Sequence, residues 1–240
     1  MTTAVKANKS ARPPLILIPG LLCDATIWRG QIEAFAATHE VIVPVLDGFD
    51  SIPDMAAAVL ERAPAEFALA GHSLGGRIAL EVIRQAPRRV TRLALLDTGV
   101  HPCAAGEPAR RQELLSIAFA EGMRAVARVW LPPMVHPSRH PDTTVIGPLE
   151  AMVERRTPVS FRNQVEALLN RPDGGPVLES IRCPTLVLCG HEDGWSPLAQ
   201  HERIAAAIGG SILAVIDECG HMAPFERPAE VTRELERWLA

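Results

Sequence analysis

Gly71-His72-Ser73-Leu74-Gly75-Gly76 is the stretch that decides how this 240-residue chain folds. It is a G-x-S-x-G sequence, standing directly after the apolar run 67–70 and directly before a helical pattern over 74–85. A serine on such a strand-to-helix turn is pushed out above the sheet, and the glycines leave room for the tight backbone. The helix N-terminus behind it favours negative charge nearby. The alternative is a serine that only caps a helix between two turn glycines.

Short apolar runs recur on both sides of this turn, and helical patterns separate them. The runs are apolar at consecutive positions, which is typical of strands buried on both faces; they cover 15–18, 41–46, 67–70, 93–96, 185–189 and 212–216. The helical patterns cover 25–37, 54–63, 74–85, 197–208 and 228–239. Alternation of this kind predicts an α/β fold with a mostly parallel sheet and helices on both faces.

The alternation stops between about 99 and 181, where helical patterns are separated by proline-rich joints. We expect one long helix over 107–130 and further helices over 143–155 and 158–170. This length of helix between two strands predicts a cap over the sheet edge. The predicted organisation is therefore a flexible tail at 1–13, an α/β core at 14–98 and 182–240, and a helical cap at 99–181.

A serine hydroxyl is a poor nucleophile unless a base takes its proton and a third group orients that base. His221 follows the last predicted strand, and Asp193 follows the run 185–189. The order Ser73, Asp193, His221 is the one expected for this motif, and it predicts a catalytic triad. Asp97, at the end of the run 93–96, is an alternative acid, and Glu192 is adjacent to the preferred one.

An oxyanion hole needs two backbone N–H donors aimed at the oxygen that becomes negative. Position alone predicts the N–H of Leu74, directly after the nucleophile, and that of Leu21, in the loop after the first strand. The alternative for Leu21 is a plain strand-to-helix turn.

Composition excludes several classes of protein. Hydrophobic residues make up 48% and charged residues 22%, which is a globular balance, and the net charge of -4 argues against a nucleic-acid binder. No apolar run approaches the roughly 20 residues that span a bilayer. Lys6 and Lys9 are the only lysines and there is no tyrosine, so Schiff-base chemistry and a tyrosine acid are not expected.

The number and spacing of the cysteines also exclude some kinds of site. There are 5 of them, widely spaced and without a C-x-x-C pair, so neither a disulfide framework nor a zinc site is predicted. The N-terminus lacks the apolar segment of a secretory signal, which predicts a cytoplasmic protein. No metal or organic cofactor is expected.

Taken together, these motifs resemble the α/β-hydrolase superfamily and its small-capped branch of carboxylesterases, lactonases and carbon–carbon bond hydrolases. The resemblance runs over nearly the whole chain after the tail, and it rests on Pro19-Gly20 with Trp28 downstream, GHSLGG at 71–76, LALLDT at 93–98, the cap, PTLVL at 184–188, Gly190-His191-Glu192-Asp193 and Cys219-Gly220-His221. One departure is Pro19, because the family usually has His-Gly before the oxyanion loop.

Arg77 stands four residues after Ser73. A similar GxSLGGR occurs in the menaquinone-pathway synthase that eliminates pyruvate, where the arginine helps to hold a substrate carboxylate. An arginine can clamp a carboxylate with two parallel hydrogen bonds; the alternative is an arginine that ties the elbow helix to the cap. Further candidates for the pocket wall, chosen because they lie beside motif residues or in the cap, are Leu22, Trp28, Trp130, Trp195 and Met222. Each of these also suits a core position.

The predicted function is hydrolysis of carboxylic esters with small to medium acyl groups through an acyl-enzyme intermediate. The expected partner is a small-molecule ester or related carbonyl compound, with no nucleic acid or membrane. Three alternatives stay open: a lactonase or carbon–carbon hydrolase with the same triad, an Arg77-assisted lyase, and a catalytically silent hydrolase-like binding protein. The sequence does not indicate acyl preference or oligomeric state.

Overall fold

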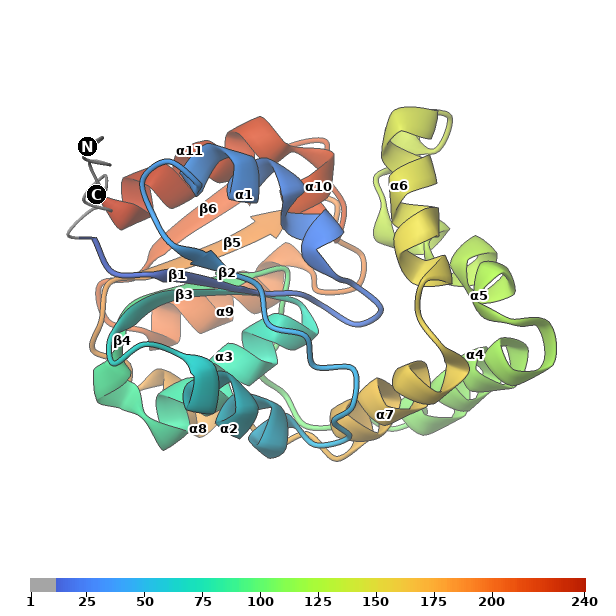
Figure 1. Cartoon of the computed structure of the whole chain (residues 1–240), viewed down its shortest axis with the longest axis horizontal. Coiled ribbons are helices and arrows are strands. Elements are labelled where there is room, and N and C mark those ends of the chain that lie inside the picture. The colour runs from blue at the N-terminus through green and yellow to red at the C-terminus, as the bar shows by residue number, and fades with distance from the viewer. Residues whose placement is uncertain (1–11) are drawn as a thin grey trace, which may run out of the picture.

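A six-stranded, fully parallel sheet forms the centre of the computed structural model, which describes residues 12–240. The strand order is β2-β1-β3-β4-β5-β6 (Figure 1). The strands are β1 (Leu15–Ile18), β2 (Val41–Ile42), β3 (Phe67–His72), β4 (Val90–Leu96), β5 (Thr185–Gly190) and β6 (Ile212–Ile216). The predicted parallel sheet is thus confirmed; of the predicted tail at 1–13, residues 1–11 lie outside the described residues.

The two edge strands depart from the prediction of strands buried on both faces. In β1, β3 and β5 every residue is buried, whereas Ile212 at the start of β6 is 62% exposed because an edge strand has a neighbour on one side only. The predicted strand 41–46 shrinks to Val41–Ile42. Pro44 explains the loss, since a proline has no N–H to donate to a ladder.

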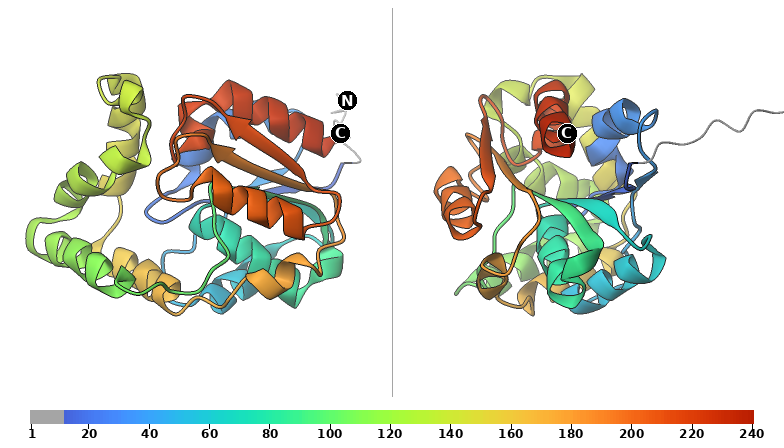
Figure 2. Two further views of the ribbon diagram at one scale, coloured as in Figure 1. Left: turned by 180° about the vertical axis from the view of Figure 1, so that it is seen from behind. Right: turned by 90° about the vertical axis from the view of Figure 1, so that its left-hand side faces the viewer.

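Helices cover both faces of the sheet, as predicted (Figure 2). One face carries η1 (Ala25–Trp28), α1 (Arg29–Phe35), α10 (Ala223–Glu226) and α11 (Pro228–Leu239). The other face carries α2 (Ile52–Arg62), α3 (Leu74–Gln85), α8 (Gly175–Leu178) and α9 (Leu198–Ala207), with the short η2 (Pro87–Arg89) leading into β4. The helix predicted over 25–37 divides into η1 and α1, whereas the helix predicted over 74–85 forms with those bounds.

The segment between β4 and β5, residues 99–181, is a helical insert beyond one end of the sheet, drawn at the right of Figure 1. Its helices are α4 (Glu107–Glu121), α5 (Met123–Trp130), η3 (Pro132–Met134), η4 (Pro137–Arg139), α6 (Thr143–Glu154) and α7 (Pro158–Leu169), after which the chain returns to the sheet at α8. The prediction of one helix over 107–130 was wrong. Gly122 separates α4 from α5 with φ 86° and ψ 175°, a conformation that only glycine adopts readily.

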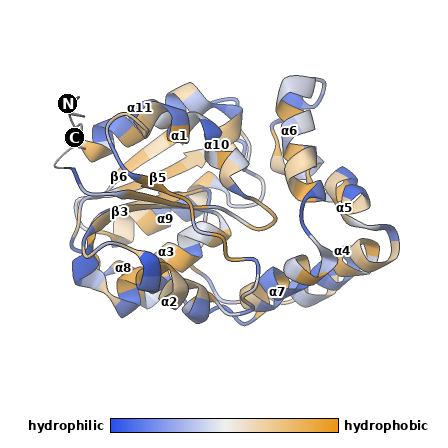
Figure 3. Ribbon diagram, in the orientation of Figure 1, coloured by the Kyte–Doolittle hydropathy of each residue, from blue (hydrophilic) through white to orange (hydrophobic). Residues whose placement is uncertain are grey.

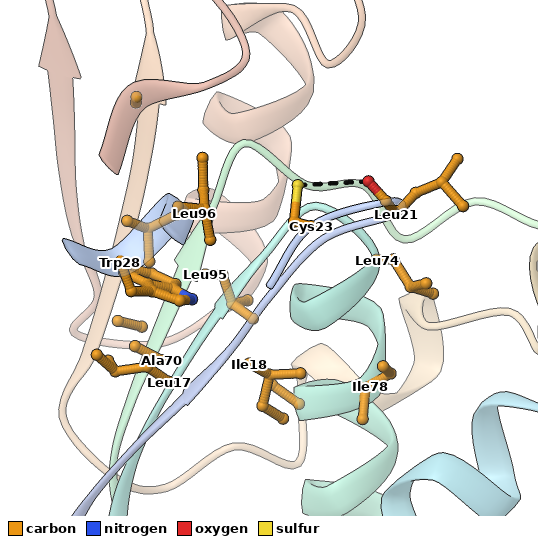
Figure 4. Packing of buried hydrophobic residues seen from close by; sticks show 14 of the residues in the cluster. Leu17, Ile18, Leu21, Cys23, Trp28, Ala70, Leu74, Ile78, Leu95 and Leu96 are labelled. Atoms are coloured by element: carbon orange, nitrogen blue, oxygen red, sulfur yellow. Dashed lines mark hydrogen bonds between the residues drawn. The ribbon is translucent and has the colours of Figure 1, made fainter. Parts of the chain in front are cut away.

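The apolar core lies between the sheet and its two helical layers. Figure 3 shows the strands as almost continuously hydrophobic, while the helices alternate between hydrophobic and hydrophilic residues. Leu17, Ala70 and Leu96 come from three adjacent strands and lie on the same face of the sheet (Figure 4). Because this layer is closely packed, the loops that leave the strand ends begin from fixed positions.

The topology itself marks where a ligand would bind. From β1 the chain crosses to β2 on one side, and it then returns to β3 on the other side of β1. In open parallel sheets the crevice at such a switch point, outside the carboxyl ends of the strands, is the usual binding place. The loop after β1 and the turn after β3 both lie there, and the insert that follows β4 faces them.

Candidate active site

Ser73 occupies the turn between β3 and α3 in a conformation that few residues adopt. Its φ is 55° and its ψ is -115°, and its N–H donates to the carbonyl of Leu96 at 2.9 Å. Glycines permit this turn, because a Cβ on Gly71 would collide with the backbone of Gly75, and a Cβ on Gly75 with the carbonyl of Ile18. The G-x-S-x-G spacing therefore follows from the lack of space around the serine.

Three side chains from three different strand ends meet at this turn. The Nε2 atom of His221 lies 2.8 Å from the Oγ atom of Ser73, and its Nδ1 atom lies 2.8 Å from Oδ2 of Asp193. Nδ1–H therefore donates to the carboxylate, which leaves Nε2 free to accept the hydroxyl proton. The structure brings the three predicted residues together in the geometry of nucleophile, base and orienting acid.

Asp193 is held as a carboxylate by its surroundings. Its Oδ1 atom accepts hydrogen bonds from the N–H groups of Trp195 and Ser196, both at 2.8 Å. Burial acts to raise the pKa of Asp193, but the charge and hydrogen bond of His221 and the two N–H donors lower it below the ordinary value. The carboxylate is thus buried, charged and fixed in orientation.

The two other acids considered from the sequence face elsewhere. Asp97 accepts from the N–H of Gly190 at 2.9 Å, and its Oδ2 lies 3.9 Å from Nε2 of His72. Burial, followed by repulsion from Asp193, raises the pKa of Asp97. Glu192 is exposed and accepts from the N–H of Cys219 at 3.0 Å.

His72, next to the serine in sequence, supports the base from behind. Its Nε2–H donates to the carbonyl of His221 at 2.7 Å, and its ring packs edge-to-face with that of Trp28, with 6.4 Å between centroids. Complete burial, followed by the nearby His221, lowers the pKa of His72 to about 3. His72 is therefore neutral at physiological pH.

Two backbone N–H groups next to the serine have no hydrogen-bond partner among residues 12–240. They belong to Leu74, the first residue of α3, and Leu21, in the loop after β1. The loop is fixed by the N–H of Leu22, which donates to Oε1 of Gln164 at 2.9 Å, and by that of Cys23, which donates to Gly20 at 3.1 Å. Figure 4 shows Leu21 and Leu74 beyond the strand ends. These are the two donors predicted for an oxyanion, and that role stays a prediction.

A cavity of about 310 Å³ opens over Ser73 between the sheet end and the insert. Its lining includes seven of the residues singled out from the sequence, namely Leu21, Ser73, Leu74, Arg77, Trp130, Trp195 and His221. The insert adds several charged side chains, which are Glu107, Arg110, Arg111 and Arg171. The cavity is large enough for a small organic molecule in contact with the serine.

Three residues expected at the pocket wall lie in the core instead. Trp28 is fully buried against His72, and Leu22 is fully buried beneath the loop that follows β1. Met222 is 1% exposed, and its N–H donates to Glu226. None of the three lines the cavity. They were expected at the wall because they lie near motif residues in the sequence, but side chains that are close in sequence can point in different directions.

Glu226 is a functional candidate that the sequence reasoning missed. Its Oε1 accepts from the N–H groups of Gly220 and Met222, both at 3.1 Å, and its Oε2 accepts from that of His136 at 2.8 Å. Since His221 lies between the first two donors, this carboxylate fixes the histidine loop and ties it to the insert. The N–H of His221 adds a second tie by donating to Met134 at 2.8 Å. Its place five residues after the histidine was the only signal in the sequence.

Residues 12–240 contain no group of three or more His, Cys, Asp or Glu side chains placed to hold a metal ion. Among their helices, none has the length and apolar character that crossing a bilayer requires.

Comparison with known proteins identifies the family. Residues 15–234 match the model of the "Alpha/beta hydrolase family". A pimeloyl-[acyl-carrier protein] methyl ester esterase of Aromatoleum aromaticum is 28% identical over 235 residues, covering 89% of this chain and 92% of the relative.

Solved structures agree with this match. A thermophilic esterase from Thermogutta terrifontis, solved with malate bound, has a TM-score of 0.87 and 28% identity, covering 96% of this chain and 90% of that one. The enol-lactonase from Burkholderia xenovorans LB400 has a TM-score of 0.85 at 21% identity, covering 97% and 92%, and shows the shared fold. The family match over nearly the whole chain confirms the resemblance drawn from the motifs, and the chain belongs to the alpha/beta hydrolase family.

Proposed function

We propose that this chain is a serine hydrolase that cleaves carboxylic esters through an acyl-enzyme intermediate. The single observation that carries the proposal is the chain of two 2.8 Å contacts from Ser73 Oγ through His221 to Asp193. A hydroxyl in contact with a buried, oriented imidazole is an activated nucleophile. Relatives that are esterases support the choice of an ester.

The geometry leads to a two-step reaction. Ser73 Oγ attacks the ester carbonyl while His221 Nε2 takes the hydroxyl proton, and Asp193 stabilises the imidazolium that forms. The carbonyl oxygen becomes negative and accepts hydrogen bonds from the N–H groups of Leu21 and Leu74. His221 then protonates the leaving alcohol. Water, deprotonated by the same imidazole, releases the acid from Ser73 and restores the enzyme.

The insert acts in this proposal as a cap over the serine. It supplies Trp130 and the charged residues that line the cavity, so it sets which acyl groups fit. All cysteines in the described residues are free thiols, and burial raises the pKa of Cys23 to about 12. Unpaired thiols suit the reducing cytoplasm, which we propose as the location.

The proposal is tested with p-nitrophenyl esters of increasing acyl length. Wild type should turn over the shorter esters, and Ser73→Ala should lower kcat by about 10⁴-fold or more while circular dichroism shows it folded. The acyl-length profile would give the size of the pocket. Equal turnover by the folded Ser73→Ala variant would reject the serine mechanism, and no ester turnover by folded wild type would reject the ester substrate.

A further inference from the structure

Thr98, two residues after the end of β4, holds the turn that carries the nucleophile. It is 1% exposed, and its Oγ1–H donates to the carbonyl of Ser73 at 2.6 Å. Its side chain packs so closely on α3 that a Cβ on Gly76 would lie 2.6 Å from its Oγ1 atom. The last glycine of the sequence 71–76 therefore leaves room for this threonine, a need that the serine turn alone does not explain.

The hydrogen bond from Thr98 falls on the peptide group that carries one of the predicted oxyanion donors. The carbonyl of Ser73 and the N–H of Leu74 belong to one planar, trans peptide, so the two groups point in opposite directions. The N–H of Leu74 has no partner among residues 12–240. A hydroxyl that fixes the carbonyl therefore fixes the direction of this N–H as well. It also polarises the peptide, which makes the N–H a stronger donor.

The other donors to the carbonyl of Ser73 come from the helix that follows it. The N–H groups of Gly76 and Arg77 reach this carbonyl at 3.0 and 3.4 Å, but both belong to α3 and would move together with that helix. Thr98 is instead attached to the end of β4, in the middle of the sheet. Its hydroxyl therefore fixes the peptide between Ser73 and Leu74 relative to the strands, whose ends carry the rest of the site.

A buried histidine on α9 holds Thr98 in turn. The N–H of Thr98 donates to Nε2 of His201 at 2.9 Å, and Nδ1–H of His201 donates to the carbonyl of Pro197 at 3.3 Å. His201 is fully buried, and this burial is the main reason that its pKa is lowered. The ring is therefore neutral, with its Nε2 lone pair directed at Thr98. Since the chain leaves β4 at Asp97 with φ 47°, His201 supplies an acceptor where the strand has ended.

We propose that Thr98 and His201 are positioning residues for the oxyanion hole, because they orient and polarise the peptide whose N–H, that of Leu74, meets the developing negative charge. This inference rests on the proposed hydrolysis and adds two residues to its machinery. They act through the backbone of the serine turn. A simple tie between β4 and α3 would contribute to stability alone, whereas an oriented donor stabilises the transition state more than it stabilises bound substrate.

Steady-state kinetics on a p-nitrophenyl ester separates these two roles. Thr98→Val keeps the shape of the side chain and removes the hydroxyl. It should lower kcat by about tenfold with little change in KM, less than the roughly 10²- to 10³-fold that loss of a whole oxyanion donor costs. Thr98→Ser restores the hydroxyl and should recover most of the rate. His201→Leu should also lower kcat, and the double variant should lose little more than the larger single loss, because the two residues act in series.

Thr185→Val is the matched control. The hydroxyl of Thr185 donates to the carbonyl of Cys183 at 3.0 Å and the residue is 4% exposed, but it stands at the start of β5, at the opposite end of the sheet from the site. This variant should keep the wild-type kcat even where its thermal stability falls. If Thr98→Val behaved in the same way, losing stability and keeping kcat, the positioning role would be overturned, whether or not His201→Leu folds.

A measurement without substrate keeps this inference separate from ester hydrolysis. The amide nitrogen of Leu74 shares its peptide with the carbonyl that Thr98 binds, so its NMR resonance reports that hydrogen bond. The resonance should move upfield in Thr98→Val and stay near its wild-type position in Thr98→Ser and Thr185→Val. An unmoved resonance in Thr98→Val would overturn the inference even where wild type cleaves esters. The upfield shift without ester turnover by wild type would reject ester hydrolysis and support the oriented donor.

Discussion

The carboxyl end of the sheet and the helical insert build the same cavity by different physical means. At the sheet end, backbone constraints between sequence neighbours or paired strands place the reactive groups: Ser73 on a glycine-flanked turn, with its N–H bonded to the end of β4. In the insert, the charged lining of the cavity forms from side chains far apart in sequence, such as Glu107 and Arg171, which are 64 residues apart. In the proposed function, the first region carries the chemistry and the second sets the selectivity.

Two of the hydrogen bonds between the regions hold the histidine loop. Met134 accepts from the N–H of His221, and Glu226 accepts from the N–H of His136. The insert therefore contacts the histidine loop as well as the cavity. We therefore expect substitutions at the sheet end to change the rate of reaction, and substitutions in the insert to change substrate preference or stability.

The largest effect is expected at the acid of the sheet end. Asp193→Asn should lower kcat by about 10⁴-fold, because the amide no longer fixes the tautomer of His221 or stabilises its charge. Asp97→Asn, at the alternative acid, keeps an oxygen for the N–H of Gly190 and should cost less than tenfold. Steady-state kinetics on a p-nitrophenyl ester would decide, and similar losses in both variants would contradict the assignment.

His72 should contribute to the pH dependence of stability. Its pKa is about 3 in the folded chain against an ordinary 6.5, so the unfolded chain takes up a proton first as the pH falls. Stability from this group is present above pH 6.5 and is lost below it, by about 2 kcal/mol between pH 7 and pH 5.

His72→Gln keeps a donor for the carbonyl of His221 but does not titrate. Urea unfolding at pH 7 and pH 5 gives the free energy of unfolding of both proteins. The contributions of other titrating groups cancel in the difference between wild type and variant. The advantage of wild type over the variant should shrink at pH 5, and an unchanged advantage would show that folding does not lower the pKa of His72.

The junction between the two regions should respond to Glu226→Gln. Glutamine offers one acceptor oxygen where the carboxylate offers two, so it cannot serve Gly220, Met222 and His136 together. We expect kcat to fall about tenfold with little change in KM, since a misplaced imidazole affects the transition state more than binding.

Glu236→Gln, exposed on α11, is the matched control for this substitution and should behave as wild type. A loss in thermal stability for Glu226→Gln with no change in kcat would reduce Glu226 to a structural role.

The smallest effects on stability are expected at two glycines of the insert, where substitution by alanine should act in opposite directions. Gly122→Ala puts a side chain at φ 86° and should destabilise the fold by about 1 kcal/mol. Gly147→Ala lies inside α6, where nothing is within 4 Å of the new Cβ, and should stabilise by up to about 1 kcal/mol. Urea unfolding measures both changes, and equal signs would contradict the strained break between α4 and α5.

The sequence predicted those parts of the fold that depend on local constraints. The helix over 74–85 has the predicted bounds, since an elbow fixes its start and an apolar stripe its length. The strand predicted over 41–46 is shorter in the structure, because apolar character alone does not reveal that Pro44 lacks an N–H donor. The break at Gly122 was visible as a glycine, but a glycine inside a helical pattern is also tolerated at a modest cost.

The candidate site divides in the same way. Ser73, Asp193 and His221 each follow a strand, so the parallel sheet brings them to one edge, and their meeting could be predicted. Trp28 and Met222 were misplaced because the direction in which a side chain points depends on tertiary packing. The pairing of Glu107, the first residue of α4, with Arg171, just after α7, joins residues 64 apart and left no local pattern to detect.

The central claim is that Ser73 is the nucleophile and that His221 and Asp193 activate it. Its most direct test is labelling with an alkyl fluorophosphonate, in which the serine oxygen displaces fluoride at phosphorus, followed by mass spectrometry of the intact chain and its peptides. We predict one phosphonyl group per wild-type chain, located on Ser73, with much slower labelling of Asp193→Asn. Labelling at another residue, or labelling of Ser73→Ala at the wild-type rate, would contradict the account.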